Sequence, residues 1–521
     1  MPTLRTVALL IVALPAAALA QHAAAPAPAS AEPAATGETA VIAPPPVQRE
    51  FRGVWVATVG NIDWPSAPGL PTATQKAELT AILDRAASLH LNAVIFQVRP
   101  SADAMYASTL EPWSAFLTGR MGRAPDPVWD PLAFAVREAH ARGLELHAWF
   151  NPFRARYPGD MGPATRSHVS RRQPSLVHRY GRYQWMDPGS AVTRRRVIRV
   201  ILDVVKRYDI DGVHIDDTFY PYPVITRGQP VPFPDAATYR AYRKRGGTLA
   251  RDDWRRHNVD LFVRELYAAV KRTKRWVKVG ISPFGIWRPG SPPSVQGFDA
   301  YANLFADSRQ WLAKGWVDYL APQLYWPIAR PGQSYADLLG WWVGQNTKGR
   351  NLWVGNYAAR VAGTAGGSEI WPAAEILDQI ALTRDEPGAS GDIFFSMATL
   401  MADPDSLDER LLAGPYAAPA LVPAFPWLGA GRPAPPVVTL SRAAHSGATV
   451  VHVAPGAKRS PWQWVLQVRT GGAWRTTILP GTTRAHTLAG APGNADAVSV
   501  IAVDRVGHES TPVVVRPRSD R

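Results

Sequence analysis

Asp211-Gly-Val-His-Ile-Asp-Asp-Thr-Phe-Tyr-Pro221 is the stretch that decides the fold, because it joins a short buried strand to two adjacent carboxylates at its end. Side chains alternate along a strand, so its aliphatic residues share one face while His214 and Asp216 share the other. The aliphatic face needs a cover of helices. If the other face points into a barrel, Asp216 reaches the open end among polar groups and Asp217 turns toward the outer rim.

Two adjacent aspartates before a proline can also do no more than cap the following turn, a role that Asp fills readily. For an isolated Asp-Asp pair this structural role is the more common one. The neighbouring segments favour chemistry instead, with Asp216 as the principal catalytic candidate and Asp217 as the second.

The chain alternates between strand-like and helix-like segments around this stretch. Strands are predicted at 51–57, 92–99, 144–151, 212–216, 277–282, 317–325, 352–356 and 392–397. Helices are predicted at 74–90, 131–142, 193–208, 252–273, 304–314, 335–345 and 372–383. Eight such units in about 350 residues predict an α/β fold, a (β/α)8 TIM barrel with a parallel sheet, and an open doubly wound sheet is the alternative.

The remainder of the 521-residue chain divides by composition. Residues 1–20 carry an apolar run and a small-residue cleavage site, which predicts a secretion signal. Residues 21–48 are an Ala/Pro spacer expected to be disordered, and 413–436 are a second Ala/Pro segment expected to be a linker. Between them, 49–412 form the predicted barrel. Residues 437–515 show short alternating strands, the pattern of a small all-β sandwich whose last strand is similar to that of a fibronectin type III domain.

Composition limits the classes of function. The chain has no cysteine, which excludes disulfides, thiolate metal sites, a cysteine nucleophile and a lipid anchor on cysteine. The formal charge of +15 indicates affinity for polyanions, although an Arg excess on a solvated face would give the same value. Because export argues against nucleic acid as a partner, acidic glycans are preferred. No transmembrane segment is predicted, so we expect a soluble periplasmic or secreted protein.

Polar and aromatic side chains gather at the predicted strand ends and on the loops that follow them, where a barrel keeps its active site. Glu145 shares a strand face with them but lies deeper, as a structural partner for a cation. Residues 152–192 add a run of arginines, which predicts a basic wall above the pocket, and aromatic faces there suit sugar rings. The substrate-binding candidates are Gln97, Arg99, Asp103, His147, Trp149, Asn151, Arg154, His214, Tyr220, Trp287, Gln323, Tyr325 and Trp326.

Several long motifs resemble one known family. They are 51–56, 96–101, 111–114, 139–154, 211–221, 280–288 and 318–326. In these segments the chain resembles glycosyl-hydrolase-like family ten, a bacterial envelope family of TIM barrels, over about residues 49–410. The resemblance implies a glycoside hydrolase, and one branch of the family acts at the division site on peptidoglycan stripped of its peptides. The family usually has Tyr after the paired aspartates, where this chain has Thr218.

Three functions remain open at this stage. The first is hydrolysis of an acidic amino-sugar glycan, with Asp216 joined by a second carboxylate, either Asp217 or one from another loop such as Asp103 or Glu111. The second is a non-catalytic glycan-binding barrel. The third is a metal-dependent hydrolase using His147 and His214, but no close-spaced ligand pair is present, so we expect no metal and no cofactor. Envelope or division proteins are possible partners of the C-terminal domain.

Overall fold

The structure is a computed structural model that describes residues 43–159, 162–363, 369–489 and 495–517. The predicted secretion signal and the spacer up to residue 42 lie outside these ranges. Within them, no helix combines the length and the apolar character needed to cross a membrane.

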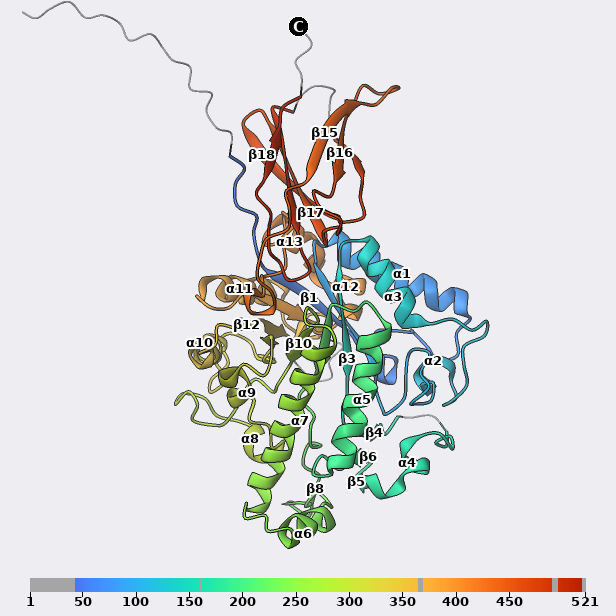
Figure 1. The fold of residues 1–521 in the computed structure, drawn as a ribbon. Coiled ribbons are helices and arrows are strands. Elements are labelled where there is room, and N and C mark those ends of the chain that lie inside the picture. The colour runs from blue at the N-terminus through green and yellow to red at the C-terminus, as the bar shows by residue number, and fades with distance from the viewer. Residues whose placement is uncertain (1–42, 160–161, 364–368, 490–494, 518–521) are drawn as a thin grey trace, which may run out of the picture. The chain divides into compact units, whose positions relative to one another are not determined.

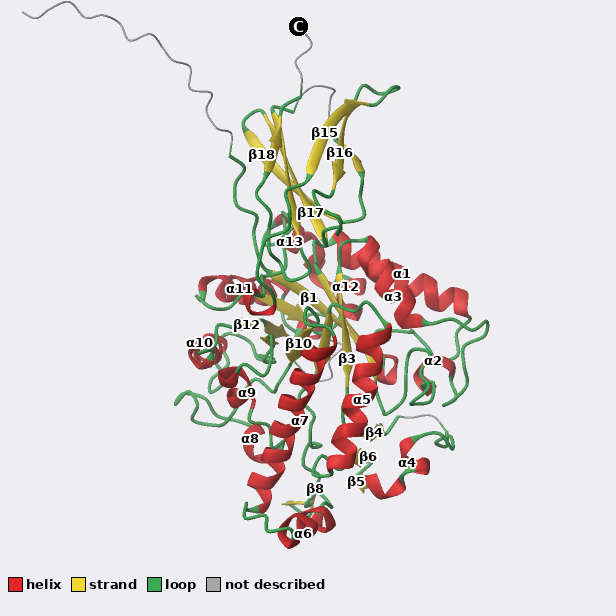
Figure 2. Ribbon diagram, in the orientation of Figure 1, coloured by secondary structure: helices red, strands yellow, loops and turns green. Residues whose placement is uncertain are grey.

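The centre of the fold is a parallel sheet that curls into a nearly closed barrel with helices around it (Figures 1 and 2). The seventh strand position is interrupted at Trp353. Its first half, β12 (Asn351–Leu352), pairs with β11 (Tyr319–Leu320). Its second half, β13 (Val354–Asn356), pairs with β14 (Gly391–Phe394), so the two edges of the sheet meet. A TIM barrel is therefore confirmed over an open doubly wound sheet. In spatial order the strands are β12 (Asn351–Leu352), β11 (Tyr319–Leu320), β10 (Lys278–Ile281), β7 (Gly212–Ile215), β3 (Glu145–Phe150), β2 (Ala93–Arg99), β1 (Phe51–Val56), β14 (Gly391–Phe394) and β13 (Val354–Asn356).

The predicted helical segments are helical in the structure, with one exception. The segment 304–314 is not one helix, because Phe305 has a φ of 54° and Asp307 caps a new start by accepting from Gln310 N. The result is a short α8 (Ala300–Asn303) followed by α9 (Ser308–Lys314). The other long helices are α1 (Thr72–Ser88), α3 (Pro131–Ala141), α5 (Ala191–Arg207), α7 (Arg251–Thr273), α10 (Tyr335–Gln345) and α11 (Ala373–Asp385).

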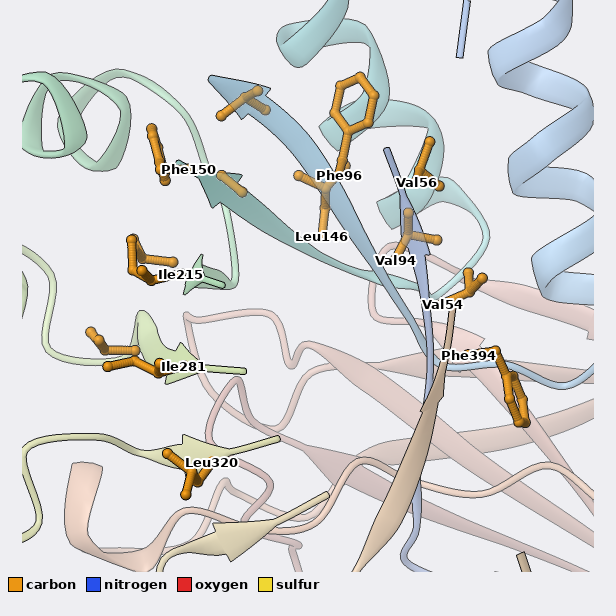
Figure 3. Packing of buried hydrophobic residues seen from close by; sticks show 14 of the residues in the cluster. Val54, Val56, Val94, Phe96, Leu146, Phe150, Ile215, Ile281, Leu320 and Phe394 are labelled. Carbon is orange, nitrogen blue, oxygen red and sulfur yellow. The ribbon is translucent and has the colours of Figure 1, made fainter. Parts of the chain in front are cut away.

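The outward face of each strand packs under these helices (Figure 3). Ile215 lies there, on the face predicted for it from alternation, and His214 points inward. Burial of this apolar layer supplies the main favourable free energy of folding, at about 25 cal/mol per Å² of apolar surface. Its members include Val54, Val56, Val94, Phe96, Leu146, Phe150, Ile215, Ile281, Leu320 and Phe394.

Inside the barrel, a chain of hydrogen bonds joins buried polar side chains. Trp55 Nε1 can only donate, and it lies 3.1 Å from His214 Nε2, so the proton of His214 is on Nδ1. His214 Nδ1 donates to the hydroxyl of Tyr319 at 2.9 Å, and Tyr319 donates to His147 Nδ1 at 2.9 Å. Burial lowers the pKa of His214 well below its usual value, which agrees with a neutral ring.

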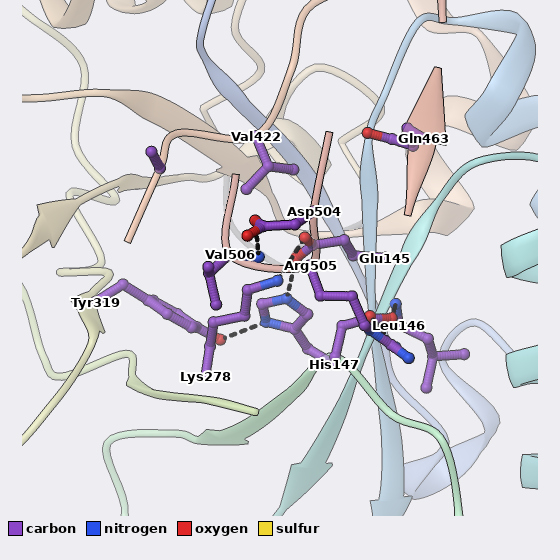
Figure 4. Close-up of polar contacts among 12 residues, drawn as sticks. Glu145, Leu146, His147, Lys278, Tyr319, Val422, Gln463, Asp504, Arg505 and Val506 are labelled. Carbon is purple, nitrogen blue, oxygen red and sulfur yellow. Dashed lines mark hydrogen bonds and ion pairs between the residues drawn. The ribbon is translucent and has the colours of Figure 1, made fainter. Parts of the chain in front are cut away.

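The chain ends at a buried ion pair near the starts of the strands (Figure 4). His147 Nε2 donates to Glu145 at 3.0 Å, and Lys278 Nζ donates to the other Glu145 oxygen at 2.5 Å. The structural role predicted for Glu145 is thus confirmed. Gly280 is required beside this chain, because a Cβ there would lie 1.8 Å from the ring of Tyr319.

The C-terminal region is all-β. Its two antiparallel sheets enclose a small core around Trp464. One sheet has the order β15 (Val437–Arg442), β16 (Thr449–Ala454), β19 (Ala485–Thr487), and the other β18 (Ala473–Pro480), β17 (Gln463–Thr470), β20 (Ala497–Val503), β21 (Val513–Val515).

The Ala/Pro segment 413–436, expected to be a linker, packs against the barrel. Leu421 exchanges backbone hydrogen bonds with Gln48 and Glu50, at 2.9 Å each. Phe425 lies in one buried cluster with Phe51 and Trp353 of the barrel interior. Arg505 of the all-β region also pairs with Asp211 at 2.5 Å. The few large side chains of the segment thus cover the starts of the barrel strands, a contact that its Ala/Pro composition does not predict.

Phe425→Ala should therefore destabilise the barrel itself. Its ring is buried, and removing a buried Phe costs about 3–5 kcal/mol. Denaturant unfolding followed by barrel tryptophan fluorescence measures the loss. Val437→Ala, at a side chain 58% exposed, is the matched control and should change stability little. Equal stability of the two variants would show that the segment is an independent linker.

Candidate functional site

Asp216 and Asp217 follow β7 directly, at the carboxyl end of the strand where the sequence places them. Asp216 is half-buried, and its carboxylate accepts hydrogen bonds from Asn151 Nδ2, from Thr218 N at 3.3 Å and from Thr218 Oγ1 at 3.0 Å. All of these partners donate, which favours a negative charge on Asp216. Thr218, which stands where the family usually has Tyr, thus contacts the principal carboxylate.

A second set of hydrogen bonds fixes the orientation of Asn151. Gln97 Oε1 accepts from the backbone N–H groups of Thr58 and Val59, at 2.8 Å each, which turns its Nε2 toward Asn151 Oδ1 at 2.6 Å. Asn151 must then present its own amide nitrogen to Asp216. Backbone groups after β1 therefore hold the catalytic candidate through two buried side chains, Gln97 and Asn151.

Asp217 differs from its neighbour in environment. It is only 8% exposed, and burial, followed by the adjacent charge of Asp216, raises its pKa from 3.8 to about 7. Tyr222 donates to Asp217 Oδ2, which leaves Oδ1 for the proton. The site thus holds two adjacent carboxyl groups with different environments, an arrangement that suits a proton donor beside a charge stabiliser.

Aromatic rings surround the pair. Tyr325 stacks on Tyr357 with ring centroids 4.6 Å apart, and Tyr222 contacts Phe298 at 5.4 Å. Burial raises the pKa of Tyr325 well above 10, and the charges of Asp217 and Asp216 add to the shift, so this ring lies near both carboxylates. Sequence reasoning placed Tyr222 among the aromatic residues of the rim, but it gave no role to Tyr357 or Phe298. Tyr357 follows β13 directly, so the strand-end rule could have found it.

Of the predicted arginine wall, Arg154 is the member near the carboxylates. It is 9% exposed, its Nε donates to Pro100 O at 2.8 Å, and its charge partly offsets the raised pKa of Asp217. Its Nη2 is buried and has no hydrogen-bond partner among the described residues. Arg156 is half-buried, and the exposed members are Arg166, Arg171, Arg172, Arg179 and Arg182.

Several predicted substrate-binding residues lie below or beside the mouth. Both ring nitrogens of His147 and of His214 are bonded inside the barrel, and neither residue is exposed, so we leave them out of the substrate-binding set and of any metal site. Arg99 forms a buried two-point pair with Glu111, at 2.7 Å for both contacts. Glu111 is thereby neutralised and held away from acid-base chemistry. Asp103 is buried and accepts from Ser101 N at 2.8 Å.

The remaining candidates are aromatic or amide side chains with protein partners. Trp149 is 6% exposed and meets the ring of His214 edge-on. Tyr220 is buried between Phe233 and Phe305, so it belongs to the core. The last three candidates each contact another side chain or backbone group. Gln323 donates to Ser282, Trp287 donates to Asp307, and Trp326 packs edge-on against Phe284.

A further carboxyl group at the strand ends was missed. Asp63, on the loop after β1, accepts from Ala57 N at 2.6 Å, Ser396 Oγ at 2.6 Å and Ala398 N at 2.7 Å. Burial raises its pKa to about 6. Because Ala57 follows β1, and Ser396 and Ala398 lie where α12 (Met397–Ala402) begins after β14, Asp63 ties the ends of these two strands together.

The chain is similar to several known proteins. Residues 50–366 match the family described as Glycosyl hydrolase-like 10. The chain is 41% identical over 399 residues to Glycosyl hydrolase YngK of Bacillus subtilis (strain 168), over 75% of this chain and 76% of that protein. It is 33% identical over 396 residues to Glycosyl hydrolase DigH of Escherichia coli (strain K12), over 71% and 86%. The solved PgaB (BpsB) glycoside hydrolase domain from Bordetella bronchiseptica aligns with 70% of this chain and 98% of its own, at 14% identity and a TM-score of 0.45.

Asp217→Asn should change how stability depends on pH. The folded protein keeps the Asp217 proton up to a pKa of about 7, whereas the unfolded chain releases it near the usual value of 3.8. The contribution of Asp217 to the wild-type free energy of unfolding therefore falls as pH rises from 3.8 to about 7, and it is constant above that interval. Asn does not titrate, so the stability of the variant relative to the wild type should rise over the same interval. Urea unfolding across this range measures the difference, and parallel curves would contradict the raised pKa.

Proposed function

The chain belongs to the Glycosyl hydrolase-like 10 family, and we propose that it is a glycoside hydrolase of an acidic amino-sugar glycan, with denuded peptidoglycan strands as the substrate. The observation that carries this proposal is the carboxyl pair at the end of β7. Asp216 is held by donors that favour its charge, and Asp217 has a pKa of about 7. Glycosidases need one carboxyl group of each kind.

In the proposed reaction, Asp217 Oδ1 gives its proton to the leaving glycosidic oxygen as the bond to the anomeric carbon breaks. The Asp216 carboxylate stabilises the positive charge that develops on the sugar ring. Water then adds to the anomeric carbon and returns a proton to Asp217, which restores the starting state. Asn151 and Gln97 hold Asp216 in place, and Tyr222 fixes which Asp217 oxygen carries the proton.

The preference for a denuded, acidic glycan rests on charge. Peptidoglycan strands without stem peptides expose lactyl carboxylates, and a guanidinium binds carboxylates with two parallel hydrogen bonds. Arg154 offers such a group beside Asp217, with its Nη2 still unpartnered in the described part of the chain. The aromatic rings of Tyr325, Tyr357 and Tyr222 supply flat faces for the sugar rings. Asp103, Gln323, Trp287 and Trp326 remain in the proposed substrate-binding set.

The location and the C-terminal region complete the proposal. The apolar run of residues 7–19 supports export, and a protein that acts on cell-wall glycan would meet its substrate in the periplasm or outside the cell. We propose that the all-β C-terminal region is a fibronectin type III-like domain and a contact for envelope or division proteins.

A non-catalytic glycan-binding barrel is the second candidate. It is favoured by one observation, namely that Glu111 is neutralised by Arg99 and is thus removed as the carboxylate opposite Asp216. The two candidate functions assign different roles to Asp217, which is catalytic only in the hydrolase.

Replacing Asp216 by Asn should lower turnover on denuded glycan about a hundredfold or more, the scale of losing one electrostatic stabiliser. Asp217→Asn should lower turnover on the natural glycan by a similar factor. It should leave turnover unchanged on an aryl glycoside whose leaving group needs no proton. Wild-type kcat/KM should fall above about pH 7, where Asp217 loses its proton. Product release from both substrates measures these effects, with melting temperatures as the check of folding. Normal turnover in both variants would show that this carboxyl pair is not catalytic, and absence of wild-type turnover on both substrates would favour the binding protein.

Arg154→Ala should discriminate between acidic and neutral substrates. Loss of a charge-assisted hydrogen bond should raise KM for denuded strands about tenfold to a hundredfold, while KM for neutral chitin oligomers of equal length changes little. Arg475→Ala, at an exposed residue of β18, is the matched control and should leave both values unchanged. An equal rise in KM on both substrates would contradict the carboxylate contact.

A further inference from the structure

The outer wall of the barrel carries a groove between α5 and α7, two helices that pack against each other (Figure 1). The groove has a volume of about 630 Å³, within the range of ligand-binding sites in proteins. Its apolar lining is aliphatic throughout and is formed by Leu110, Ile198, Leu202 and Ala269.

Four exposed cations border this aliphatic floor. Arg195, Arg199 and Lys206 follow one another along α5, over twelve residues or about 16 Å of helix, and Arg272 stands on α7. None of the four has an ion pair or side-chain hydrogen bond among the described residues. The charge is therefore available to a ligand.

The carboxylates of the groove do not balance these cations. Asp203 is already paired with Arg207, whose Nη2 lies 2.7 Å away. Glu265 is then the one lining carboxylate of the described groove without such a pair. The groove thus joins an excess of positive charge to a strip of aliphatic side chains.

We propose that this groove docks the protein on a bilayer surface through an anionic phospholipid. The phosphate meets the cations of α5 and α7, and the first methylene groups of the acyl chains meet Ile198 and Leu202. An acidic glycan would find the same charge, but sugar rings bind on aromatic faces, and the lining of this groove has none. The inference does not depend on the proposed glycosidase activity, since the groove shares no residue with the carboxyl pair.

The test is sedimentation of the full-length protein with phosphatidylcholine vesicles that contain or lack phosphatidylglycerol. The wild type should bind the anionic vesicles, and binding should weaken at high salt. The triple variant R195A/R199A/K206A should lose at least about tenfold in partition, because each cation near an anionic surface contributes several-fold. The matched control R240A/R243A/K244A removes three exposed cations from α6 (Ala236–Lys244) and should stay within about twofold of the wild type.

Three results would overturn the proposal. Absence of wild-type binding to anionic vesicles removes the site, and equal losses in both triple variants assign binding to net charge. Reduced binding of the α5 variant to denuded glycan, with unchanged binding to vesicles, would assign the groove to a glycan. Melting temperatures confirm that each variant is folded. Leu202→Gln alters only the aliphatic floor of the groove, and it should also weaken binding to anionic vesicles.

Discussion

The hydroxyl of Tyr319 lies 2.9 Å from His147 and 2.9 Å from His214, and the interior of the barrel is arranged around it. A buried polar side chain is costly unless it is bonded, so every polar group that points into the barrel needs a partner there. The donor-only indole of Trp55 at one end and the Glu145–Lys278 pair at the other give each bond of this chain its direction. The strands that carry these residues are thereby held in one register.

Polar side chains nearer the carboxyl ends of the strands are also bonded to one another, but their chain of hydrogen bonds ends at a carboxyl group. Two backbone N–H groups orient the amide of Gln97, and Gln97 in turn orients the amide of Asn151. Asn151 then donates to Asp216, which is half-buried. The lower layer is closed to solvent, and the ring nitrogens of Trp55, His214 and His147 are all bonded there, so it supports the fold. The upper layer ends in carboxyl groups and in the unpartnered Nη2 of Arg154, which suits the proposed role in binding a glycan.

The starts of the strands are covered by a part of the chain far away in sequence. Phe425 packs on the barrel interior, and Arg505 pairs with Asp211, the first residue of the stretch that leads to the carboxyl pair. Because Asp211 Oδ2 also accepts from Leu146 N at 2.9 Å, this pair joins the C-terminal region to β3. The C-terminal region thus contributes to the packing of the barrel as well as carrying its own core.

The sequence by itself determined the order of strands and helices, the outward face of β7 and the place of the carboxyl pair at its end. These properties are local, because alternation and helical spacing are set by neighbouring residues. The tertiary structure decided which polar side chains are open to a ligand. His147, His214 and Arg99 satisfy the same strand-end rule as Asn151, but their partners Tyr319, Trp55 and Glu111 come from other segments. Phe425 also acquired its role only through contacts with Phe51 and Trp353, which are distant in sequence, and such contacts leave no periodic signal in the chain.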